Sequence, residues 1–312
     1  MLARWIKATV ANRRTGISGQ PQVRVRRSRL RSAITAVALV TGLTATASLP
    51  APASADQTRQ ARQVAYVTNL SDDTVSVIDV ASNTTIATIP VGNAPLGVAA
   101  SPGGTRVYVT NNGSNTVSVI DTATNGVIAV IPVGALPYDV AVSPGGTRAY
   151  VTNQGAGTVS VIDTATNIVI ATIPVGAQPF GVAVTPGGTR VLVTNRANST
   201  VSVIDTATDT VIATIPVGAQ PFGVAVTPGG TRAYVANTGA NNVSVIDVAR
   251  NSVITTVPVG TQPLGVAVTL GGTRAYAVNL TTVSVINTAT NTVEATLGVG
   301  NNAIEVAIAN VP

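Results

Sequence analysis

Apolar and polar residues alternate in short runs along the chain from residue 65 onward, and turn-forming residues separate the runs. Typical runs are AYVTN at 149–153 and TVSVID at 158–163, both rich in valine, isoleucine and threonine. Alternation with a period of two is the pattern of half-buried β-strands, and this region shows no stretch with the periodicity of an amphipathic helix. The pattern therefore predicts an all-β fold.

The strand-like runs recur every 42 residues. AYVTN or a near variant begins at Ala65, Val107, Ala149, Val191, Ala233 and Ala275. In each copy the runs TVSVID, VIATIPV and GVAVTPGGTR or their variants follow, and Asp-Thr-Ala-Thr-Asn and Pro-Gly-Gly are short reversals suited to hairpins. Four antiparallel strands per repeat of about 40–45 residues indicate a β-propeller blade. A parallel β-helix is the main alternative, but it has shorter rungs and lacks these hairpins.

The motifs YVTN, VSVIDTATN, VIATIPVG and GVAVTPGGTR resemble those of the YVTN β-propeller repeat family, which is associated with surface-layer proteins. The resemblance extends from Ala65 to the C-terminus. It implies a propeller fold, and it implies relatives that include surface structural proteins, periplasmic binders and, more distantly, lactonase-like enzymes. Many relatives have seven blades, whereas this sequence supplies six copies.

The innermost strand of each blade is expected to be the GVAV run, because small residues suit the crowded axis of a propeller. No such strand precedes Ala65 in the repeat region. The C-terminal strand, Ile304–Ala309, is therefore predicted to pair with Ala65–Asn69 and close the ring. The predicted fold is a six-bladed β-propeller of four-stranded antiparallel blades that spans residues 65–312.

Residues 1–55 have a different composition, with nine of the 18 basic residues and no acidic residue. An arginine-rich stretch leads into an apolar run from Ala33 to Leu49, and Ala53-Ser54-Ala55 follows. This order is typical of a secretory signal peptide. We predict cleavage after Ala55 by the Sec or Tat route, a short polar linker over 56–64 and a secreted or cell-surface protein. A retained anchor is the alternative, but the run is shorter than the roughly 20 residues of a membrane span.

Removal of residues 1–55 changes the charge of the protein. Nine basic residues then remain against all 12 acidic ones, which leaves a net charge of about −3. A mildly acidic surface offers no attraction to phosphate backbones, so no nucleic-acid partner is expected. The mature chain is expected to be a monomer without a stable membrane span.

The chain has no histidine and no cysteine. Catalytic triads and the usual zinc sites are therefore excluded, and oxygen-ligated metal chemistry remains. Asp139 and Glu305 replace glycine at the start of two innermost strands and would face the mouth of the central channel. Calcium is the metal that such ligands suit, and the resemblance implies that six-bladed lactonase-like enzymes hold calcium in this region. The other interpretation is sequence drift at a solvated rim, with no cofactor.

The loop after AYVTN differs between copies, whereas PGGTR and DTATN hardly change. Loops on a rigid scaffold commonly bind partners. The candidate binding residues are Asp72, Asp73, Asn112, Gln154, Arg196, Asn198 and Asn241 in these loops, with Tyr138, Phe180 and Phe222 nearby as aromatic anchors. The alternative is that the loops drift without constraint and the aromatic residues pack between blades.

Strand register also predicts a charge pattern. If Asn153 lies opposite Thr158, Arg148 faces Asp163, and the same count places Arg274 opposite Asn287. We interpret these as cross-strand pairs that stabilise the blades. The tyrosines of AYVTN are expected to pack rather than to bind, because Leu192 takes their position in the fourth copy.

Taken together, these features favour an exported, non-enzymatic propeller that acts as a cell-surface or extracytoplasmic interaction scaffold, with a protein or an envelope component as its partner. The alternative function is a metal-assisted hydrolase of the lactonase type that uses Asp139 and Glu305.

Overall fold

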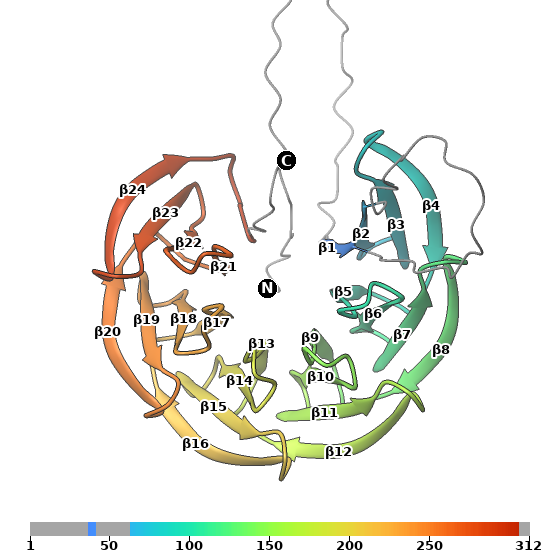
Figure 1. Ribbon diagram of the computed structural model, residues 1–312, viewed down its shortest axis with the longest axis horizontal. Coiled ribbons are helices and arrows are strands. Elements are labelled where there is room, and N and C mark those ends of the chain that lie inside the picture. The colour runs from blue at the N-terminus through green and yellow to red at the C-terminus, as the bar shows by residue number, and fades with distance from the viewer. Residues whose placement is uncertain (1–36, 42–62, 306–312) are drawn as a thin grey trace, which may run out of the picture.

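The computed structural model describes residues 37–41 and 63–305, which form six four-stranded antiparallel sheets. The sheets follow one another around a central axis as the blades of a propeller, with one strand of each near the axis and one at the periphery (Figure 1). The predicted all-β architecture with six sheets is confirmed. Within the described residues, no helix is long and apolar enough to cross a membrane.

Strand order from the axis outward follows chain order in every blade. The strands of the first three blades are β1 (Val37–Thr41), β2 (Gln63–Asn69), β3 (Thr74–Asp79) and β4 (Thr84–Pro90); β5 (Pro95–Ala100), β6 (Arg106–Asn111), β7 (Thr116–Asp121) and β8 (Gly126–Pro132); and β9 (Pro137–Val142), β10 (Arg148–Asn153), β11 (Thr158–Asp163) and β12 (Ile168–Pro174). Those of the last three are β13 (Pro179–Val184), β14 (Arg190–Asn195), β15 (Thr200–Asp205) and β16 (Thr210–Pro216); β17 (Pro221–Val226), β18 (Arg232–Asn237), β19 (Asn242–Asp247) and β20 (Ser252–Pro258); and β21 (Val266–Val268), β22 (Arg274–Val278), β23 (Thr282–Asn287) and β24 (Thr292–Gly298).

The hydrophobic core lies between blades. In one cluster, Tyr150, Val159 and Val161 of the third blade pack against Val191 and Val193 of the fourth, and similar clusters join each consecutive pair from the first blade to the sixth. Leu192 is fully buried in the position that tyrosine holds in other copies. The tyrosine position therefore serves packing, as the sequence predicted.

The asparagine of YVTN connects two strands of its own blade. Asn195 is fully buried, and its Nδ2 donates to Thr200 Oγ1 at 3.0 Å and Ser202 Oγ at 2.9 Å. Its Oδ1 accepts a hydrogen bond from Gly176 N of the preceding blade at 3.1 Å. The same Nδ2 bonds recur in the other five blades. The asparagine that marks the repeat therefore serves as a structural bracket, that is, a buried side chain that links the second and third strands of its blade through hydrogen bonds.

The threonine of YVTN ties neighbouring innermost strands together. Thr110 Oγ1 accepts from Gly97 N at 2.8 Å and donates to Tyr138 O of the next blade at 2.9 Å. The fifth copy has Ala236 at this position, and there Gly223 N donates directly to Leu264 O at 3.0 Å. Contact between adjacent innermost strands is therefore preserved with or without the hydroxyl group.

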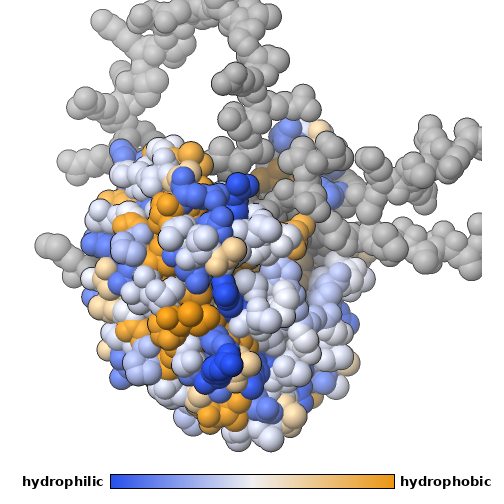
Figure 2. Space-filling view, turned by 60° about the vertical axis from the view of Figure 1, so that its left-hand side comes forward, coloured by the Kyte–Doolittle hydropathy of each residue, from blue (hydrophilic) through white to orange (hydrophobic). Residues whose placement is uncertain are grey.

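Each outermost strand carries a β-bulge that interrupts its regular ladder. In β12 the register shifts so that Val161 faces Ala171 while Ile162 faces Val169, which leaves Ile170 unpaired. The residues at this position are exposed in five blades: Ile86, Ile128, Ile170, Ile212 and Ile254. Figure 2 shows apolar surface interspersed with polar residues on one side of the ring. Bulges of this kind blunt edge strands against pairing with other chains.

The predicted closure of the ring by Ile304–Ala309 on the first AYVTN strand is not shown among residues 37–41 and 63–305. The inner edge of β2 pairs instead with β1, in register from Val37↔Val67 to Thr41↔Gln63. An open strand edge accepts any apolar strand within reach, and β1 comes from the apolar run of the predicted signal peptide. The rest of the predicted signal peptide and linker, 1–36 and 42–62, and residues 306–312 of the predicted closing strand lie outside the described residues.

Candidate functional site: the variable-loop face

The variable-loop face consists of the loops between the second and third strands of each blade and the GxxP loops that precede the innermost strands of the second to sixth blades. Backbone hydrogen bonds join the two sets across neighbouring blades: Gln154 N donates to Leu136 O at 2.9 Å and Arg196 N to Gln178 O at 2.9 Å. Similar bonds recur at Asn112, Thr238 and Leu280. The loops that vary in sequence therefore share one braced backbone arrangement.

Several of the predicted binding side chains take part in this bracing. Asp73 Oδ1 accepts from Ala94 N at 2.8 Å, and Asn241 Oδ1 accepts from Gln262 N at 2.9 Å. Both residues have positive φ, at 56° and 52°, as polar residues in tight turns often do. Asn112 Nδ2 donates to Pro137 O at 3.0 Å. These three side chains help to build the face.

Other predicted binding residues present more of their side chains to solvent. Asp72 and Asn198 are exposed, and Gln154 and Arg196 are half-buried. Asn198 Oδ1 accepts a hydrogen bond from Ala177 N. The face therefore combines a repeated frame with side chains that differ from blade to blade.

An aromatic cluster lies at the axis, where the innermost strands begin. The ring centroids of Tyr138 and Phe180 are 4.4 Å apart, and those of Phe180 and Phe222 are 5.0 Å apart. Leu264 and Ile304 complete the cluster. The structure thus brings together the three predicted aromatic residues, but Phe180 and Phe222 are only 4% and 6% exposed. Tyr138, which is half-buried, is the member best placed to contact a partner.

Arg196 reaches from the fourth variable loop over this cluster. Its guanidinium carbon lies 5.4 Å from the centroid of Phe180, within the range of a cation–π contact. Nη2 donates to Gln220 Oε1 at 3.2 Å. The sequence indicated Arg196 as a loop residue but not its link to the axis, since loop variability carries no information on the direction of a side chain.

The carboxylate of Asp139 is engaged by backbone donors. Its Oδ1 accepts from Val140 N at 2.9 Å and its Oδ2 from Val182 N of the next innermost strand at 3.2 Å. Glu305 follows Ile304 of the axial cluster. Among residues 37–41 and 63–305, no three acidic side chains gather as a metal site. Bracing between the innermost strands accounts for Asp139, and its pairing with Glu305 on a metal stays a prediction.

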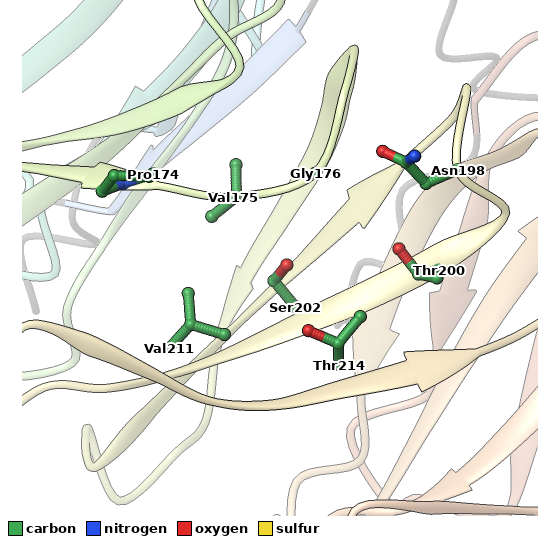
Figure 3. A pocket seen from close by; sticks show the side chains of 8 residues that line it. All are labelled: Pro174, Val175, Gly176, Asn198, Thr200, Ser202, Val211 and Thr214. Carbon is green, nitrogen blue, oxygen red and sulfur yellow. The ribbon is translucent and has the colours of Figure 1, made fainter.

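A groove of about 460 Å³ lies between the third and fourth blades (Figure 3). Val175 and Val211 supply apolar wall, and Asn198, Thr200, Ser202 and Thr214 supply polar groups. The hydroxyl groups of Thr200 and Ser202 already accept from Asn195 Nδ2. No ionisable residue is among those that line the groove, so it offers no acid–base group for catalysis.

The opposite face is built from the nearly constant turns. The predicted register is confirmed, with Arg148 opposite Asp163 and Arg274 opposite Asn287. The hydrogen bonds of Arg148 go to the next blade, where its Nη1 donates to Thr206 O at 2.6 Å and to Asp209 Oδ1 at 3.0 Å. The twist between blades brings this neighbouring turn within reach of the long side chain. Arg148 thus links the third blade to the fourth.

Aspartates at the start of these turns accept hydrogen bonds from their own loops. Asp163 Oδ1 accepts from Thr166 N at 2.8 Å, from Thr166 Oγ1 at 2.8 Å and from Ala165 N at 3.1 Å. The Thr166 backbone N–H is the main cause that lowers the pKa of Asp163 below its usual value. Backbone donors likewise lower the pKa of Asp121, Asp205 and Asp247.

These pKa shifts predict loss of stability in acid. Because the folded pKa values lie below the unfolded value of about 3.9, the stabilisation is present above that pH and is lost as the pH falls through the folded values. Thermal melts from pH 6 to pH 2 check this. Asp→Asn substitution at positions 121, 163, 205 and 247 is expected to flatten the decline and keep the fold, because Asn287 makes the same turn bonds in the sixth blade. An unchanged decline would contradict the assignment.

Two solved structures are similar in fold to this chain. A functionally unknown protein from Desulfotomaculum acetoxidans DSM 771 superposes with a TM-score of 0.68 at 21% identity, over 76% of this chain and 80% of that chain. Kuenenia stuttgartiensis hydrazine synthase gives a TM-score of 0.51 at 21% identity, over 72% and 92% of the two chains. At these identities the likeness shows the fold alone. A search of curated proteins gives no significant match.

A family model extends over the central blades. The model of the YNCE-like beta-propeller matches residues 100–190 and 184–274, which together exceed half of the chain. Six similar blades, the inter-blade cores and the bracketing asparagines agree with this match. The protein therefore belongs to the YNCE-like β-propeller family.

Proposed function

We propose that the protein is an exported, non-enzymatic β-propeller that binds a protein or another envelope component through its variable-loop face. The observation that carries the proposal is the contrast between the two faces. On the variable-loop face a repeated set of backbone bonds holds loops whose side chains differ, whereas the turns of the opposite face keep nearly the same sequence. A rigid frame with diverse side chains binds without a large cost in loop ordering.

The centre of this face has the composition of a binding surface. Tyr138 and Arg196 are residue types that contribute strongly at interfaces, and both are half-buried around the buried ring of Phe180. Their mobility is restricted by the cluster beneath them, so a partner that packs here orders few new rotamers. Asn198, in the same loop as Arg196, and Asp72, in the loop of the first blade, would supply polar contacts around this centre.

The proposed export, the cell-surface location and membership of the surface-layer YVTN type rest on sequence. The basic stretch, the apolar run and Ala53-Ser54-Ala55 support a signal peptide, and the YVTN motifs support the surface type. In the proposed mature chain, which begins at Asp56, β1 is absent. Closure of the ring then falls to Ile304–Ala309, as the sequence predicts.

The proposal is tested first at Arg196. Arg196→Ala is expected to weaken binding to an isolated cell-envelope fraction by roughly tenfold or more, because truncation removes an anchor at the centre of the surface. Arg250→Ala is the matched control, since Arg250 lies in a turn of the opposite face and its side chain is 80% exposed. Co-sedimentation over a concentration series measures both variants. Equal binding by the two variants would count against Arg196 as an anchor.

A further inference from the structure

The inner edge of β2 in the first blade is a binding site for one strand, and β1 occupies it. Ala38 of β1 faces Tyr66. In each of the other five blades an alanine of the innermost strand faces the residue at the tyrosine position: Ala99 faces Tyr108, Ala141 faces Tyr150, Ala183 faces Leu192, Ala225 faces Tyr234 and Ala267 faces Tyr276. β1 thus sits in the register of an innermost strand.

Two segments of the chain have the sequence for this position. β1 reads Val37-Ala38-Leu39, and the C-terminal segment reads Val306-Ala307-Ile308. Both match the Val-Ala-Val of the innermost strands in the third to sixth blades, with a small residue between two larger apolar ones. Ala267 faces Tyr276 in the sixth blade, and the loop of that copy is two residues shorter than the others, so its counterpart 40 residues further on, Ala307, is the residue that would face Tyr66.

The last described residues make the contacts that come before an innermost strand in other blades. Ile304 is 5% exposed in the axial cluster with Phe180, Phe222 and Leu264. A Cβ added at Gly265 would lie 2.5 Å from Ile304 O, and one added at Gly223 would lie 2.6 Å from Leu264 O. The backbone of Ile304 therefore lies against the innermost strand of the sixth blade, as that of Leu264 lies against the innermost strand of the fifth. By the repeat, the residues that follow Glu305 correspond in sequence to an innermost strand.

We infer that β1 and residues 304–309 are alternative occupants of the inner edge of β2. The edge has one row of backbone donors and acceptors, so it pairs with one strand at a time. In the full chain β1 holds the edge and shields it from pairing with another molecule. When residues 1–55 are removed, the C-terminal segment takes the edge and closes the ring. The inference rests on the proposed function for the removal of residues 1–55.

Engineered disulfides test which strand holds the edge. The chain has no cysteine, so a cross-link reports only on the residues introduced. Val64 faces Val40 in β1 and, by the repeat, would face Ala309 of the C-terminal segment. The two double variants are Val64→Cys with Val40→Cys and Val64→Cys with Ala309→Cys. Both are made in the full chain, the second also in residues 56–312, and Val64→Cys alone is the control for links between molecules.

After mild oxidation, the full chain is expected to cross-link positions 64 and 40 but not 64 and 309, and residues 56–312 to cross-link 64 and 309 within one molecule. If the shortened chain does not fold, Leu39→Pro in the full chain serves instead, because proline removes a donor from β1, and the 64–309 link is then expected to rise. Equal 64–309 linkage with and without β1, no such linkage in any chain, or links only between molecules would overturn the inference. Purified protein is used, so failure here leaves partner binding by the variable-loop face intact.

Discussion

Gly181→Ala is expected to lower the free energy of unfolding by roughly 3 kcal/mol or more, because there is no space for a methyl group between adjacent innermost strands. A Cβ at this position would lie 2.5 Å from Phe222 O and 3.4 Å from Gly223 Cα, both in the backbone of the next blade. Backbone cannot rotate away as a side chain can. The fourth and fifth blades must separate at the axis, where the aromatic cluster packs.

The control substitution for Gly181→Ala lies in the same repeat. Gly187 is in the hairpin on the opposite face, and a Cβ there would meet no atom within 4 Å. Gly187→Ala is therefore expected to change stability by about 0.5 kcal/mol or less. Chemical denaturation of both variants measures the difference. Similar stabilities would show that the innermost strands are not in close contact.

Asn195→Ala is expected to cost about 2–4 kcal/mol, because it leaves buried polar groups without partners. The substitution removes the acceptor of Gly176 N and the donor to Thr200 Oγ1 and Ser202 Oγ in a fully buried site. Serine and threonine hydroxyls can turn to other acceptors, but the Gly176 N–H is fixed by the backbone. The junction between the third and fourth blades should therefore loosen first.

Asn198→Ala provides the matched control for this loss. Asn198 lies three residues further along and is exposed, so water replaces its bond to Ala177 N. We expect a change of about 0.5 kcal/mol or less. Thermal and urea unfolding of the two variants separate a structural bracket from a surface residue. A loss of stability from Asn195→Ala no larger than that from Asn198→Ala would refute the structural role of Asn195.

Much of the fold could be predicted because the same strand and turn signals recur in every repeat. Alternating valines mark the strands, the hairpin residues fix the register, and Arg148 accordingly lies opposite Asp163. Contacts between blades were harder to foresee. Strand register says which residues share a sheet, whereas the contact of Arg148 with Thr206 depends on the twist between two sheets.

The place of β1 could not be predicted from local pattern. Its apolar run satisfies the pattern of a signal peptide, and nothing in that pattern shows that Val-Ala-Leu also matches an innermost strand. At the candidate site, the sequence indicated the variable loops and the three aromatic residues. It did not distinguish Asp73 and Asn241, which brace the loops, from Asp72 and Asn198, which are exposed, because bracing depends on partners in the GxxP loops.

Loop exchange within the chain tests most directly the central claim that the variable-loop face binds the partner. In one variant every variable loop of four residues receives the sequence Gln-Gly-Ala-Gly of residues 154–157. The exchange keeps the backbone bonds to the GxxP loops that the third copy makes, and it removes both the diversity and the side-chain braces of Asp73, Asn112 and Asn241. In the control, lysine replaces the exposed residues Ala123, Ala165 and Ala207 in turns of the opposite face. Binding to an isolated cell-envelope fraction is measured for both, with thermal melting to confirm folding. The account predicts that the exchanged loops abolish binding while the control retains it; full binding by a folded loop-exchange variant would contradict it.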